Sequence, residues 1–234
     1  MDAANEALGT AIARAQTFRR RVFVQTSLRS NTRVAANALP PETLASIFEI
    51  ARGECSCWLS ATENRQRCEQ HTSTWKHWIR ITEVCRQWRE VALDDCLLWN
   101  KIYIEKQCTK RVLRCLRRAG DAPLDITISD YDTLPHPIRV ELAQRYSQLR
   151  RLTIQNVAHS SDELASLIRS TSAPLLERLD LVNTDWERHH GGLLPLTFAY
   201  HTPRLRSLFL SGMATLPLVQ TNHLAHLHCT ENKS

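Results

Sequence analysis

Leucine recurs in the C-terminal half of this 234-residue chain in a pattern that few folds can accommodate. The pattern Leu-x-x-Leu-x-Leu begins at Leu149, Leu176 and Leu205, at steps of 27 and 29 residues, and a weaker copy ending in Cys229 begins 19 residues later at Leu224. Side chains two residues apart in a strand share one face, so each copy predicts a short strand with its last two apolar residues turned inward. Repetition at this period predicts stacked units, each of which buries its apolar side against the next.

The pattern resembles irregular leucine-rich repeats. The alternating segment Leu124-x-Ile126-x-Ile128 fits one more strand ahead of the first copy. The resemblance implies a short α/β solenoid over residues 123–234. Apolar helical segments would cover its outer side, as at Leu164, Leu167 and Ile168.

These repeats are expected to be irregular and to present a binding face. The asparagine that regular repeats carry is shifted by one position, to Asn156 and Asn183. Solenoids bind partners on their concave strand face, so we expect Thr153, Asp180 and Phe209, which lie between inward residues, to be exposed there. The last copy lies close to the final residue, and we therefore expect an array without a polar C-terminal cap and with little order at that end.

Residues 37–104 have a different periodicity, which predicts a small helical domain. Leu44, Ile47, Phe48 and Ala51 recur at helical spacing after two prolines, and proline is tolerated in the first turn of a helix. Asn37 can cap this helix, and Gly53 is a plausible stop.

A second helix is predicted over residues 75–93. Its apolar stripe follows steps of three and one and consists of Trp78, Ile81, Val84, Cys85, Trp88, Val91 and Ala92. The opposite face carries Arg86 and Glu90, an i,i+4 ion pair. Leu98 and Trp99 follow as a short apolar segment. A domain this small buries so many large side chains poorly by itself, which indicates an obligate partner.

The strings ALPPETLASIFEI and WIRITEVCRQWREVALDDCLLWNKI resemble an F-box, most closely the F-box-like domains of mushroom-forming fungi. The resemblance implies a helical domain that docks on a Skp-type adaptor, which is itself tethered to a cullin. For Leu39, Pro40 and Phe48 we favour adaptor contact, and for Cys85 and Trp88 internal packing. The full set of adaptor-binding residues that the resemblance implies is Leu39, Pro40, Leu44, Ile47, Phe48, Val84, Cys85, Trp88, Leu98 and Trp99.

An insert at residues 53–76 departs from the short loop of many F-boxes. It holds Cys55, Cys57, Cys68 and His71, which could supply four zinc ligands, but the first pair is separated by one residue where zinc sites typically use two to four. We predict a solvated loop with free thiols and no metal site. The eight cysteines follow no secretory signal, so we expect reduced thiols in the cytoplasm or nucleus.

The net charge of +6 is concentrated near the N-terminus, where residues 1–36 carry six Arg against two acids. Alanine spacing predicts a basic helical leader there, and residues 14–33 also suit the composition of a mitochondrial transit peptide. Residues 105–122 predict a basic helical connector. Its basic face is either a patch for an acidic partner or, as we favour, solvated while the apolar side docks on the next domain.

Together these features predict an α+β chain that is the substrate receptor of a cullin-type ubiquitin ligase: the F-box binds the adaptor and the repeats bind an unknown target protein. We expect no catalytic residue, no cofactor and no membrane partner, because no nucleophile–base signature, glycine-rich phosphate loop or long apolar run is present. Nucleic acid is an improbable partner, since the tryptophans lie away from the basic segments. Two alternatives stay open: a zinc- or nucleic-acid-binding regulator, and a truncated F-box protein without a target.

Overall fold

A computed structural model describes residues 2–31, 34–52, 78–105, 109–131, 133–155, 172–182, 202–211 and 224–230. Within these ranges the chain combines helices with a parallel sheet, and it divides into two compact units, Met1–Leu93 and Asp94–Ser234. The predicted positions Cys55, Cys57, Cys68, His71, Asn156, Leu164, Leu167, Ile168 and Asn183 lie outside the described residues.

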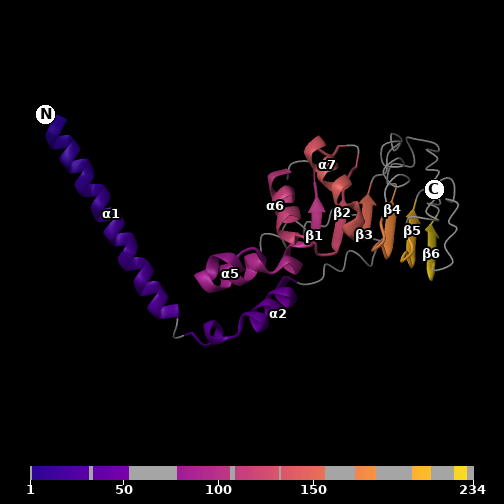
Figure 1. Cartoon of the computed structure of the whole chain (residues 1–234), viewed down its shortest axis with the longest axis horizontal. Helices are drawn as coiled ribbons and strands as arrows, with labels where there is room; N and C mark the ends of the chain where they lie inside the picture. The colour runs from indigo at the N-terminus through magenta and orange to yellow at the C-terminus, as the bar shows by residue number, and fades with distance from the viewer. Residues whose placement is uncertain are drawn as a thin grey trace. The chain divides into compact units, whose positions relative to one another are not determined.

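The first unit is helical (Figure 1). Its elements are α1 (Asp2–Asn31), the short 3-10 helix η1 (Ala35–Ala38), α2 (Pro41–Arg52), α4 (Ile81–Val84) and α5 (Arg86–Asp94), whose last residue crosses the unit boundary. The helix predicted after the prolines is confirmed as α2, and its ladder starts with the Leu44 N–H donating to the Pro40 carbonyl at 3.0 Å.

The continuous helix predicted over residues 75–93 is wrong within its described part. Cys85 has extended backbone angles (φ −154°, ψ 175°), and it separates α4 from α5. Periodicity cannot detect such a break, because apolar residues on both sides keep the same spacing. The expected cap at Asn37 is also wrong, since this residue lies inside η1.

The second unit is built on one sheet. Its strands are β1 (Lys101–Ile104), β2 (Leu124–Ile128), β3 (Leu149–Gln155), β4 (Arg178–Val182), β5 (Ser207–Ser211) and β6 (His226–Thr230). Its helical elements are η3 (Cys96–Trp99), α6 (Thr109–Ala119), α7 (His136–Gln144) and η4 (Tyr146–Gln148). Every strand from β2 to β6 overlaps a segment that the leucine pattern predicts.

The strands follow one another across the sheet in chain order, and every neighbouring pair is parallel, as Figure 1 shows from β1 to β6. The register aligns alternate apolar residues in two columns, which are buried from β1 to β5, whereas Leu227 and Cys229 of β6 are exposed, contrary to the expectation that they turn inward. One column is Ile102, Ile126, Leu152, Leu179, Leu208 and Leu227, and the other is Ile104, Ile128, Ile154, Leu181, Leu210 and Cys229. β1 begins this sheet although no strand was predicted there.

The last three strands are joined to their predecessors by the same backbone contact. The carbonyl of Arg150 accepts from the N–H of Glu177, that of Glu177 from Arg206, and that of Arg206 from Ala225, at 2.8 to 2.9 Å. These four residues occupy the second position of the Leu-x-x-Leu-x-Leu pattern. The repeat in sequence is therefore also a repeat in hydrogen bonding.

A proline turn precedes two of the strands. The Leu176 N–H donates to the Ala173 carbonyl and the Leu205 N–H donates to the Thr202 carbonyl, both at 3.1 Å. Proline follows the accepting residue in both turns, a position that its fixed φ angle suits. This turn positions the first leucine of these two copies.

The predicted exposure of Asp180 and Phe209 is wrong. Asp180 is buried, and its carboxylate accepts from Arg178 Nε at 2.9 Å and from the Thr153 hydroxyl at 3.3 Å. Phe209 is buried as well and stacks on His228, with ring centroids 5.2 Å apart. The alternation of the pattern identifies which residues share a face, but not whether that face is open.

α6 lies in the segment predicted as a basic helical connector. Its apolar side is buried at Val112, Cys115, Leu116 and Ala119, and the helix packs against η3, β1 and α7. Gly120 ends the helix with a positive φ of 54°, a conformation that costs glycine little.

Candidate interaction surface

α2 has two apolar sides, and only one of them is packed. A helix turns by about 100° per residue, so Leu44 and Phe48 project from one side, whereas Ile47 and Ile50 project from another, about a third of a turn away. Leu44 and Phe48 are fully buried. Ile47 is 41% exposed and Ile50 is 79% exposed. Ile47 and Ile50 form what we call the outer stripe of α2, and Pro40, just before the helix, is also exposed.

Aromatic packing holds the inner side of α2. The ring of Phe48 lies 5.1 Å from that of Trp88 on α5, tilted by 55°, a favourable arrangement for two aromatic rings. At the end of α2 the Arg52 guanidinium lies 5.9 Å from the centre of the Trp78 ring. Because Phe48 and Arg52 are anchored in this way, the rotation of α2 is fixed and its outer stripe faces away from its own core.

Cys85 organises the break between α4 and α5. Its Sγ atom accepts from the Trp88 N–H at 3.5 Å, and its carbonyl accepts from the Arg89 N–H at 3.1 Å, so Cys85 caps α5 as serine caps many helices. The Arg89 Nε donates back to the Thr82 carbonyl at 2.7 Å and thereby links α5 to α4. The predicted Arg86–Glu90 pair is confirmed at 2.8 Å, and this hydrogen bond raises the pKa of the Arg86 guanidinium.

The same junction holds the segment that leads into α2. The Cys85 thiol donates to Asn37 Oδ1 at 3.7 Å, and the Gln87 side chain donates to the Leu39 carbonyl at 3.5 Å. Asn37 and Leu39, just before α2, are therefore tied to the α4–α5 junction through side chains 48 residues along the chain. Nothing in the local sequence pattern indicates this role of Gln87.

Leu98 and Trp99 pack within the second unit. Both are buried, and the Arg118 guanidinium of α6 lies 4.3 Å from the centre of the Trp99 ring. Burial and the nearby Arg114 lower the pKa of Arg118. Asp95 caps η3 by accepting from the Leu97 N–H at 3.0 Å. These residues connect η3 to α6, and Leu97 is the exposed apolar residue of this element.

The structure sorts the predicted adaptor-binding residues into three groups. Exposed are Pro40, Ile47 and Val84; half-buried are Leu39, Cys85 and Trp88; buried are Leu44, Phe48, Leu98 and Trp99. Phe48, which we expected to favour contact with the adaptor, is covered in the free chain by its own domain. Ile50 is the most exposed apolar residue of α2 and was missed, although its spacing of three from Ile47 was visible in the sequence.

The described ranges contain no group of three or more His, Cys, Asp or Glu residues placed to hold a metal ion. No described helix combines the length and the apolar character that crossing a membrane requires. The cysteines and histidine of the insert lie outside these ranges.

Residues 36–105 match the family model described as F-box-like. The match spans α2, α4, α5, η3 and β1, and it crosses the boundary between the two compact units. An F-box-like domain is thus present where the two quoted strings predict it. Comparison with curated proteins and with solved structures returned no match.

Proposed function

We propose that this chain is a substrate-recognition subunit of an SCF-type cullin ubiquitin ligase. The F-box-like domain docks on a Skp-type adaptor and, through it, on the cullin, while the sheet of the second unit holds a target protein. The role calls for no catalytic residue in this chain, because the ligase gains rate by raising the effective concentration of the target lysine near the charged conjugating enzyme. It places the protein in the cytoplasm or nucleus. The resemblance to fungal F-box-like domains is part of the same proposal.

The outer stripe of α2 is the observation that carries adaptor binding. Ile47 and Ile50 lie beside a packed inner side, and an apolar stripe is normally the face by which a helix meets another element. Exposed apolar surface next to a complete core marks an interaction site. The match to the F-box-like family covers the same helix and indicates a Skp-type adaptor as its partner.

The sheet supports the second half of the proposal. Six parallel strands in chain order, aligned apolar columns and one recurring backbone contact are what stacked repeat units produce. We infer that the second unit is an array of irregular leucine-rich repeats. Such arrays bind proteins over extended surfaces, and joining one to an adaptor-binding domain brings the target to the ligase.

Measuring the affinity of the full chain for purified Skp adaptor tests the proposal. Ile47→Asp with Ile50→Asp places two charges on the outer stripe and leaves the inner side intact. Because central apolar contacts dominate interfaces, we expect the dissociation constant to rise about thirtyfold or more. Tryptophan fluorescence of the variant should match that of the wild type, because Trp78 and Trp88 belong to the inner side.

Glu49→Ala is the matched control outside the outer stripe of α2, where Glu49 is exposed. It should leave the dissociation constant within about threefold of the wild-type value, since surface changes outside an interface have small effects. Unchanged adaptor affinity in the Ile47→Asp, Ile50→Asp chain would remove the outer stripe as the docking surface. Failure of the wild-type chain to bind the adaptor would remove the function itself.

A further inference from the structure

α1 is a long helix whose described side chains are all in contact with solvent. Residues 9–26 are exposed throughout, and Phe18 and Phe23 are 70% and 72% exposed. Single helices are marginal in water, and most gain their stability by packing an apolar face. A helix that presents two phenylalanines in this way indicates a surface that covers it.

The charge of α1 identifies the kind of surface. Arg14, Arg19, Arg20 and Arg21 lie in its middle, and the chain carries no acidic residue between Glu6 and Glu42. An anionic surface would complement this charge. The same charge disfavours a second copy of α1, because its arginines would repel their equivalents.

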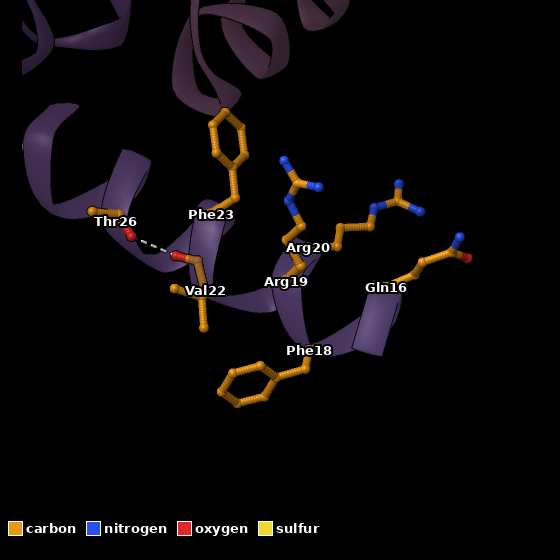
Figure 2. Close-up of a pocket in the computed structure, with 7 residues that line it drawn as sticks. All are labelled: Gln16, Phe18, Arg19, Arg20, Val22, Phe23 and Thr26. Atoms are coloured by element: carbon orange, nitrogen blue, oxygen red, sulfur yellow. Dashed lines mark hydrogen bonds between the residues drawn. The ribbon is translucent and has the colours of Figure 1, made fainter. Parts of the chain in front are cut away.

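The arrangement of the apolar residues favours a bilayer over a protein groove. At about 100° per residue, Ile12, Phe18, Val22 and Phe23 spread over an arc of about 140° that includes Arg19, while the exposed Val24 lies outside this arc. Figure 2 shows Phe18 and Phe23 on different sides of the helix, with Arg19 and Arg20 reaching outward. The residues that Figure 2 labels line a hollow and all belong to this one helix, so the hollow is no enclosed cavity. In a groove Arg19 would be buried, whereas at a lipid surface it can reach the headgroup phosphates while its neighbours enter the acyl boundary.

We propose that α1 binds flat on the surface of an anionic phospholipid bilayer. Phe18, Val22 and Phe23 enter the interface, and the arginines pair with lipid phosphates. The expectation of no membrane partner rested on the lack of a long apolar run, which a helix lying in the interface does not need. This proposal is independent of adaptor binding, since none of these residues belongs to the F-box-like domain.

Flotation of the full chain with lipid vesicles tests the proposal. We expect binding to phosphatidylcholine vesicles that contain phosphatidylserine, little binding to pure phosphatidylcholine, and release as salt is raised. Arg19→Glu with Arg20→Glu and Arg21→Glu should weaken binding at least about tenfold. Phe18→Ser with Phe23→Ser leaves the charge unchanged and should weaken it by a similar factor, which distinguishes insertion from simple charge attraction.

Matched controls come from the second unit. Arg114→Glu with Arg117→Glu reverses exposed charges on α6, and Val140→Ser removes an exposed apolar side chain on α7. Both should bind vesicles as the wild type does, and circular dichroism should show equal helix content in all chains. Vesicle binding that persists in either α1 variant would overturn the proposal. So would a wild-type chain that ignores the vesicles but binds RNA or an acidic protein through the same arginines.

Discussion

Arg150 holds both carboxylate oxygens of Asp125, with Nε 2.9 Å from Oδ1 and Nη2 2.6 Å from Oδ2. The register explains how the two residues meet. β3 pairs Leu149 with Leu124 and then Arg151 with Asp125, so Arg150 is the extra residue of a β-bulge. The Asp125 side chain is 2% exposed, and the hydrogen bonds to it raise the pKa of Arg150. The bulge therefore places a cation against a buried carboxylate.

Removing that cation should destabilise the second unit. Arg150→Met leaves a buried charge without its partner, and we expect the free energy of unfolding to fall by about 3 kcal/mol. Urea denaturation followed by circular dichroism measures this change. Arg114→Met, on the exposed face of α6, is the control and should change it by less than about 0.5 kcal/mol. Equal effects of the two substitutions would show that the paired hydrogen bonds between Arg150 and Asp125 contribute nothing to stability.

The two sides of α2 should respond differently to truncation. Phe48→Ala leaves a cavity beside Trp88, and we expect the free energy of unfolding to fall by about 3 to 5 kcal/mol. Ile50→Ala removes an exposed side chain and should change it by less than about 0.5 kcal/mol while weakening adaptor binding. Thermal unfolding followed by tryptophan fluorescence, together with adaptor titration, measures both. A large stability loss in Ile50→Ala would contradict the division into a packed and an outer side.

The thiol of Cys85 should act as a helix cap. Cys85→Ala removes the acceptor for the Trp88 N–H and the donor to Asn37, and we expect a loss of about 1 kcal/mol in the free energy of unfolding. Cys85→Ser keeps a donor and an acceptor at the same position, so most of that stability should remain. Chemical denaturation of the wild type and the two variants measures the free energy of unfolding of each. If serine is as damaging as alanine, Cys85 acts through packing and not as a cap.

Asp180 should make stability depend on pH. Burial raises the pKa of Asp180, although Arg178, Thr153 and Arg151 oppose the shift. As the pH falls toward the ordinary value of 3.8, the folded chain takes up this proton before the unfolded chain does, so the contribution of Asp180 to the free energy of unfolding increases. Asp180→Asn lacks this gain. In a series of denaturation measurements, the free energy of unfolding of the wild type relative to that of the variant should therefore increase as the pH falls from neutrality. A difference that stays constant with pH would refute this prediction.

Much of the sheet could be predicted from the sequence, because strand position and side-chain alternation are both encoded in local spacing. Leu152, Leu179 and Leu208 align in one column as their equivalent places in the pattern imply. β1 was not predicted because it is short, follows a helical domain and lacks the first leucine of the Leu-x-x-Leu-x-Leu pattern. The burial of Asp180 and Phe209 could not be predicted, since it depends on contacts across the sheet and not on the strand itself.

The interaction surface was predictable in outline only. The spacing of α2 identified a helix and its apolar residues, but only three-dimensional packing separates Phe48, which contacts Trp88, from Ile50, which is 79% exposed. The hydrogen bonds from Cys85 to Asn37 and from Gln87 to Leu39 each join residues 48 positions apart. Such links have no local signature, because a side chain that bonds to a distant backbone leaves the periodicity unchanged.

The inclusion of β1 in the F-box-like match has a practical consequence. A fragment cut at residue 105 would retain β1 but lose β2, the neighbour that satisfies its backbone. The severed strand would offer an unpaired edge to other copies, and such edges promote aggregation. Trp99 would also lose the cover of α6. Trimming this protein to its recognised domain should therefore yield insoluble material, whereas truncation before Asp94 would leave the sheet whole.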